Sequence, residues 1–209
     1  MLSEMEKDVL VEVMNTNIGL AASLLSEMAS QKVILSVPEL DLKKGNEIDF
    51  RDIDRNMADF SKSVMSTLRF GNRFSGNAYI VFPADKAKNL INACTGESSA
   101  SEDADFQKLS LEDLDVIKEI SNIIFNAVIG EFGNLLDVRL EYTFPSIEMT
   151  MISDVENTIL PEEMHFLSMY TSFLLSESQV KGVIFIALTM NSEKMLIDKI
   201  DEMLVELNV

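Results

Sequence analysis

The sequence contains an internal repeat, and this repeat constrains the fold more than any other feature. A shift of 107 positions aligns residues that the two halves share: Glu12 with Glu119, Asn15 with Asn122, Lys32 with Arg139 and Pro38 with Pro145. Each half reads in the same order, as a long helix, a strand, a pair of strands and a closing helix. Two copies of one unit predict a fold with an internal pseudo-twofold axis.

The long helix that opens each half is predicted from apolar spacing and from its start signal. Ser3 with Glu6, and Ser110 with Asp113, have the spacing of a capping box, in which two side chains bond free backbone N–H groups of the first turn. These helices are predicted over residues 3–29 and 110–136. In the first of them, apolar residues recur at helical spacing, at Leu10, Met14, Ile18, Ala21, Leu25 and Met28.

Alternating apolar segments predict the strands of both halves. The predicted strands cover residues 31–42, 64–70, 77–82, 138–151, 166–175 and 180–188. Pro38 indicates an edge strand or a bulge, because proline cannot donate a hydrogen bond to a β ladder. Pro83 opens a short helix that runs to about Cys94 and ends at Gly96, and Asn191 caps a last helix that runs to the C-terminus.

These elements predict an α+β fold in a single domain. A strand exposed on two faces would be costly, so the strands of both α-β-β-β-α repeats are expected to join one mixed or antiparallel sheet, with the two long helices packed on it. The first repeat covers residues 1–96, an acidic linker covers 97–107, and the second repeat covers 108–209. Two small independent lobes are the alternative. The charged segments 43–58 and 152–163 are left unassigned, with short helices as one option.

Composition excludes several functions. The chain has 17 basic and 35 acidic residues and a formal net charge of −18, which disfavours nucleic acid and anionic membranes as partners. Cys94 and His165 are the single cysteine and histidine, too few for a Cys/His zinc site, and no G-x-S-x-G elbow occurs. The start lacks a secretory pattern, and the longest uninterrupted apolar stretch, 183–188, is short for a membrane span. We therefore expect a cytoplasmic protein.

Three Glu-x-x-Asn pairs occur in the sequence, and their positions on the helices separate them: Glu12/Asn15, Glu119/Asn122 and Glu131/Asn134. At 100° per residue, with Leu10 or Ile117 set at zero and the buried stripe at about 0–80°, the first two pairs lie at about 140–200°. The third pair points toward about 260–320°. The third pair is therefore set aside. Each long helix is predicted to present a carboxylate and a carboxamide side by side.

Small side chains share the surface of each of the first two pairs. The first motif face comprises Glu12, Asn15, Gly19, Ser23 and Ser26, and the second comprises Glu119, Asn122, Asn126, Gly130 and Gly133. A face of small residues lets a partner's backbone approach closely. The alternative is a helix face packed on another part of the same protein. That alternative explains the glycines, but it does not explain why Glu and Asn recur in one geometry after 107 residues.

Both helices resemble a known motif. They read EVMNTNIGLAASLLS from Glu12 and EISNIIFNAVIGEFG from Glu119. The pattern E-x-x-N-I-G-x-G-x-A-x-x-A-L-S belongs to the CheC family of chemotaxis phosphatases, relatives of CheX and of the motor protein FliY. The segments VILSVPELDL and GNAYIVFPADKAKNLI are also similar to the family. Asn17, Ile124 and Asn126 replace glycines of the pattern, and Asn17 lies at the core edge, where it is expected to need a hydrogen-bond partner.

The resemblance implies a phosphatase for the aspartyl phosphate of a CheY-like response regulator. Asn15 or Asn122 would orient the attacking water, Glu12 or Glu119 would bind the regulator's lysine, and no covalent intermediate would form. The small residues of the motif faces would be the docking surface. No cofactor of its own is implied, and Mg²⁺ is expected in the regulator.

Two other functions are compatible with the resemblance. One is a regulatory module that partners the receptor deamidase CheD, with weak or no catalysis. The other is a flagellar switch component like FliY, which is less favoured because no further domain follows the second repeat. Because the chain and a regulator's phosphorylation pocket are both acidic, a weak and transient complex is expected, with Lys7, Lys32 and Lys118 as local compensation.

Overall fold

The computed structural model describes residues 2–44, 47, 62–96, 109–151, 165–174 and 179–206. The predicted linker and most of the two unassigned segments lie outside these residues. The described elements are α1 (Glu4–Ala29), β1 (Ile34–Lys44), β2 (Ser63–Gly71), β3 (Gly76–Pro83), α2 (Ala84–Thr95), α3 (Leu111–Leu135), β4 (Glu141–Tyr142), β5 (Ser146–Thr150), β6 (His165–Leu174), β7 (Gln179–Leu188) and α5 (Met190–Glu206).

The strands form one seven-stranded sheet, in the order β1-β6-β7-β3-β2-β4, with β5 also paired to β2. Each pairing among these strands is antiparallel. The pairs β1–β6 and β3–β7 each join a strand of the first half to a strand of the second. The α+β prediction of one shared sheet is therefore confirmed, and the sheet is antiparallel throughout its described part.

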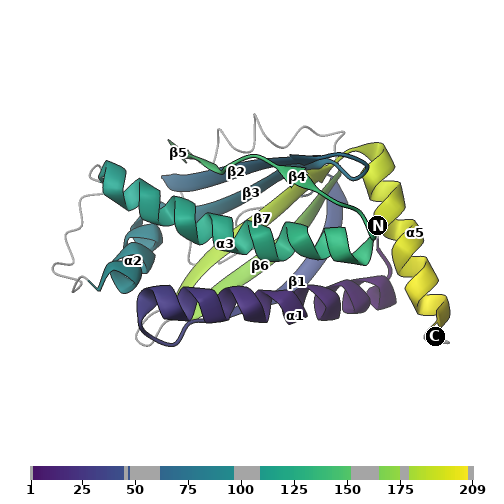
Figure 1. Cartoon of the computed structure of the whole chain (residues 1–209), viewed down its shortest axis with the longest axis horizontal. Coiled ribbons are helices and arrows are strands. Elements are labelled where there is room, and N and C mark those ends of the chain that lie inside the picture. The colour runs from purple at the N-terminus through teal and green to yellow at the C-terminus, as the bar shows by residue number, and fades with distance from the viewer. Residues whose placement is uncertain are drawn as a thin grey trace.

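The two long helices lie side by side on one face of this sheet and run in opposite directions (Figure 1). The predicted apolar stripe of α1 is confirmed with one shift at its end, because Ala29 is buried and Met28 is only half-buried. The shorter helices α2 and α5 lie at opposite ends of the molecule (Figure 1). This arrangement leaves the outward sides of α1 and α3 available for other contacts.

Both predicted capping boxes form. Ser3 and Glu6 exchange side-chain-to-backbone hydrogen bonds at the start of α1, and Ser110 and Asp113 do so at the start of α3. Asp113 is 8% exposed and also receives two hydrogen bonds from Lys88 of α2, at 2.8 and 3.0 Å. Burial alone would raise the pKa of the Asp113 carboxyl, but Lys88 and the Ser110 N–H group outweigh it and hold the pKa below its usual range.

Strand β1 has both features that Pro38 indicated. It is an edge strand, and its register with β6 shifts between Ser36 and Glu39, which marks a bulge or irregularity at the proline. The single strand predicted over 138–151 is wrong, because the segment forms two short strands, β4 and β5, which both pair with β2. The break falls at residues 143–145, where buried Pro145 has no N–H group to donate.

The last helix begins earlier than predicted. Thr189 precedes α5, and its hydroxyl accepts a hydrogen bond from the Ser192 N–H group at 3.4 Å. Asn191, the predicted cap, lies inside the first turn instead. Thr189 therefore occupies the capping position, which threonine fills nearly as well as asparagine.

By length and composition, one described helix, α1, could cross a membrane. No long uninterrupted apolar run marks this helix in the sequence, because polar residues interrupt it. Its apolar stripe packs against β1, α3 and α5, so the molecule already covers part of the apolar surface of the helix. The length of α1 is therefore weak evidence for a membrane span.

Candidate functional site

The third Glu-x-x-Asn pair lies at the contact between the two long helices. Asn17 of α1 donates a hydrogen bond from Nδ2 to Oε2 of Glu131 in α3. Asn134 donates to the same oxygen at 3.2 Å. This contact confirms that Asn17 needs a partner, and it gives the third pair a structural role in joining α1 to α3.

The first motif face is open at most of its positions. Glu12, Asn15, Gly19 and Ser23 are exposed, and a Cβ atom added at Gly19 would meet nothing within 4 Å. A helix needs no glycine for its own packing at such a position, since alanine would be more stable there. The described residues therefore leave this surface accessible from solvent.

Ser26, at the end of the first motif face, serves the fold. Its hydroxyl donates to the Ala22 carbonyl at 2.7 Å and accepts from the Val33 N–H group at 2.9 Å. The small side chain thereby ties the last turns of α1 to the residue just before β1. A docking role for Ser26 stays a prediction, as it does for the other small residues of both faces.

The second motif face is more closely bordered by its own chain. Glu119 and Asn126 are exposed, whereas Asn122 and Gly130 are half-buried. At Gly133 an added Cβ would lie 3.1 Å from the Val138 carbonyl oxygen. The Val138 N–H group also donates to the Gly133 carbonyl at 2.9 Å, so the chain folds back over this end of α3.

The two Glu/Asn pairs are separate candidate sites. Asn17 lies beside Glu131, and the helices run in opposite directions, so the Asn15 and Asn122 positions are displaced toward opposite ends of the helix pair. At 1.5 Å per residue, they are about 16 Å apart along the helix axes. Each face would therefore act on its own bound partner.

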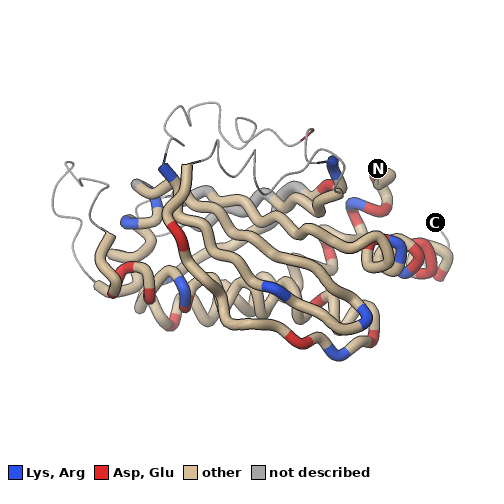
Figure 2. The backbone as a smooth tube through the Cα atoms, turned by 90° about the horizontal axis from the view of Figure 1, so that it is seen from above, with Lys and Arg blue, Asp and Glu red and all other residues tan. Residues whose placement is uncertain are grey.

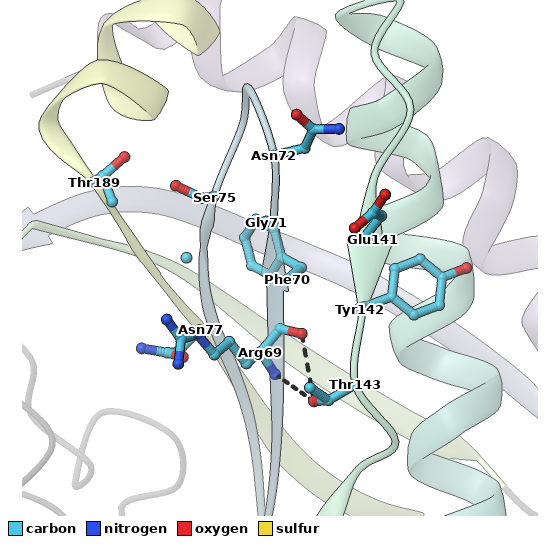
Figure 3. Close-up of a pocket in the computed structure, with 11 residues that line it drawn as sticks. Arg69, Phe70, Gly71, Asn72, Ser75, Asn77, Glu141, Tyr142, Thr143 and Thr189 are labelled. Carbon is cyan, nitrogen blue, oxygen red and sulfur yellow. Dashed lines mark hydrogen bonds between the residues drawn. The ribbon is translucent and has the colours of Figure 1, made fainter.

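Two hollows flank β4. One, of about 640 Å³, lies between the β2–β3 hairpin, β4 and Thr189, and contains none of the predicted site residues (Figure 3). The other, of about 510 Å³, is lined by Gly130, Gly133, Asn134, Asp137, Val138, Arg139, Leu140 and Tyr142, and we call it the α3 hollow. It continues directly from the second motif face. Sequence reasoning missed Arg139 and Tyr142 as candidate site residues. The alignment of Lys32 with Arg139 was the one signal in the sequence that pointed to this part of the chain.

Charges on the described surface are mixed. Figure 2 shows charged residues mainly on helices and at strand ends, with the middle of the sheet mostly uncharged. Lys7, expected to offset the acidity near α1, pairs with Glu4 at 3.1 Å and Asp41 at 3.3 Å, and the Glu4 hydrogen bond is the main reason that the pKa of Lys7 is raised. Its charge is therefore largely compensated within the chain.

Other reactive groups give no competing centre in the described part of the chain. Burial raises the pKa of the Cys94 thiol to about 11, so it is not a thiolate near neutral pH. His165 pairs through Nδ1 with Glu193 at 3.0 Å. No group of three or more His, Cys, Asp and Glu residues is placed to hold a metal ion among the described residues.

Solved structures share this fold, whereas no protein-family model matches the chain. Thermotoga maritima FliY superposes with a TM-score of 0.74 at 16% identity, covering 97% of this chain and 98% of that chain. FliM from a Helicobacter pylori FliG–FliM complex gives 0.66 at 11% identity, covering 94% and 100%. A Shewanella CheC-like superfamily protein gives 0.52 at 15% identity, covering 86% and 98%. The fold is the CheC-like fold. The resemblance seen in the sequence is therefore confirmed at the level of the fold.

Proposed function

We propose that the protein accelerates hydrolysis of the aspartyl phosphate of a CheY-like response regulator in the cytoplasm. The observation that carries the proposal is the contrast among the three Glu-x-x-Asn pairs. The third is used between α1 and α3, whereas the two that match the family motif lie on the outward sides of these helices. A structural role accounts for the third pair and leaves the repeated geometry of the other two unexplained.

The chemistry requires little of the protein. Water attacks phosphorus, the bond from phosphorus to the regulator's aspartate oxygen breaks, and inorganic phosphate and a free carboxylate result. Such a reaction depends on positioning and charge balance. The carboxamide of Asn15 or Asn122 can accept from and donate to the attacking water, which a carboxylate cannot do. Glu12 or Glu119, one helical turn away, would bind the regulator's lysine and fix the docked pose.

Loss of both carboxamides tests the proposal. We expect the Asn15→Ala, Asn122→Ala double variant to lose all acceleration, so that phosphate leaves the regulator at the rate of its Mg²⁺-dependent self-hydrolysis. Asn89→Ala, at an exposed helical position of α2, is the matched control and should retain full activity. Phosphate release is measured with the cognate regulator, and circular dichroism checks the fold. No acceleration by the wild-type protein, or full acceleration by the double variant, would refute the proposal.

A binding module of the flagellar switch is the second candidate. The superpositions favour it, because the TM-scores with FliY and FliM exceed that with the CheC-like protein. One of those structures is a complex of FliM with FliG. Under this candidate the protein would bind motor components without accelerating phosphate loss, and a pull-down from flagellated cells would retain a FliG-like protein.

A further inference from the structure

We infer that the α3 hollow is a second contact for the regulator docked on the second motif face, with Tyr142 and Arg139 as docking residues. The inference rests on the proposed function and adds to it. It makes the two candidate sites unequal, because the second site would bind the regulator with higher affinity than the first.

The hollow is continuous with the second motif face. Gly130 and Gly133 belong to both, and they lie 8 and 11 residues from Asn122, which is about 12 and 16 Å along the helix. An interface at the upper limit for a weak, transient complex covers about 600 Å² on each partner, equivalent to a disc about 14 Å in radius, which reaches Gly130. A regulator centred near Asn122 would therefore also cover the mouth of the hollow.

The lining of the hollow has the character of a recognition surface. Tyr142 is 47% exposed, and its ring projects from the α3 side of β4 (Figure 3). Exposed tyrosines beside a hollow are typical anchors of protein interfaces. Arg139 is exposed at the same place and supplies positive charge in a chain of net charge −18. Arg139, with Asp137 in the same lining, adds a positive charge that lowers the repulsion between this acidic chain and a regulator whose phosphorylation pocket is also acidic.

The first motif face differs at two corresponding positions, although exposed Lys32 matches Arg139 in charge. The 107-residue shift places Leu35 at the position of Tyr142, and Leu35 is only 6% exposed. It also places Ser26 at the position of Gly133, and the Ser26 hydroxyl is already bonded to Val33. Residues that border a hollow in the second half are used in the first half to attach the strand β1. The second contact is therefore specific to one site.

Two single-site backgrounds isolate this effect. Asn15→Ala leaves only the second site active, and Asn122→Ala leaves only the first. In the Asn15→Ala background, Tyr142→Ala and Arg139→Gln should each raise the KM for the phosphorylated regulator by about fivefold to tenfold, with kcat changed little. In the Asn122→Ala background the same changes should leave KM within about twofold. Lys32→Gln, the first-half counterpart of Arg139→Gln, should have no effect in the Asn15→Ala background.

The outcomes separate the inference from the proposed function. Unchanged KM for both variants in the Asn15→Ala background, or equal increases in both backgrounds, would overturn the inference and leave the phosphatase proposal intact. A wild-type protein that does not accelerate phosphate loss would instead overturn the proposed function, and the inference with it. Circular dichroism and urea unfolding of each variant show whether a raised KM reflects a damaged fold.

Discussion

The helices α1 and α3 follow one plan, yet each is fixed to the molecule differently at its start, middle and end. The capping box of α1 is exposed, whereas that of α3 is partly buried and continues into an ion pair with Lys88. After α1 the chain passes directly into an eleven-residue edge strand, β1. After α3 it folds back over Gly133 and forms two short strands, β4 of two residues and β5 of five. The comparison shows that a duplicated unit can keep its motif while its surroundings diverge.

The middle of the helix pair shows the same divergence. Asn17 and Glu131 form a polar contact across the interface. The 107-residue shift turns this pair into Ile124 and Leu24, which are fully buried and 44% exposed, respectively. The two positions that share a hydrogen bond on one side of the pseudo-twofold axis are thus apolar on the other. The departure from the family pattern at Asn17 therefore joins α1 to α3, whereas the departure at Ile124 adds an apolar side chain to the buried core.

The start of α3 should be the most sensitive of these regions. Asp113→Ala removes both a capping box and an ion pair with Lys88, and should lower the free energy of unfolding by about 3 kcal/mol. Glu6→Ala removes only an exposed cap and should cost about 1 kcal/mol or less. Urea unfolding at neutral pH measures both. Equal losses of unfolding free energy in the two variants would show that burial of the Asp113 contact adds nothing to stability.

The same contact predicts a pH dependence. The pKa of the Asp113 carboxyl is lower in the folded protein than its usual value, so its contribution to stability is present above about pH 4 and is lost as the pH falls through the folded pKa. Stability of the wild-type protein should therefore decline more steeply below about pH 4 than that of Asp113→Ala. Urea midpoints measured between neutral pH and about pH 3 provide the check, and parallel curves would contradict it.

The middle of the helix pair offers a test that compares identical side chains. Glu131→Ala leaves the partly buried Asn17 amide without its acceptor and should cost about 2 kcal/mol of unfolding free energy. Glu12→Ala, at an exposed position, should change stability by less than about 0.5 kcal/mol while impairing activity at the first site. If Glu12→Ala proves the more destabilising change, the two pairs do not differ in role as described.

Most of the framework could be predicted from sequence because its signals are local. The capping boxes, the apolar stripe of α1 and the bulge at Pro38 each depend on residues a few positions apart. The third Glu-x-x-Asn pair was separated from the others by its helical angle alone. Local spacing also located both motif faces, although their catalytic and docking roles stay predictions.

The features that could not be predicted from the sequence depend on contacts between residues far apart in the chain. Nothing near Asn17 in sequence indicates Glu131 as its partner, since 114 positions separate them. The break between β4 and β5 depends on pairing with β2, and the α3 hollow depends on where residues 137–142 fold back. Apolar periodicity shows that a segment is extended. It does not show how much of the segment finds a partner strand.

Two glycines, one on each motif face, give the smallest expected effect and the finest comparison. Gly19→Ala should raise the free energy of unfolding by up to about 1 kcal/mol, because alanine favours the helix and its Cβ meets open space. At Gly133 the same gain is opposed by the Val138 carbonyl, 3.1 Å from the new Cβ, so Gly133→Ala should be neutral or lower stability by about 1 kcal/mol. Paired urea titrations resolve the difference between the two variants. Equal stabilisation by both variants would mean that the segment containing Val138 moves away from α3 at no cost in stability. The closeness of this segment to the second motif face would then not constrain what binds there.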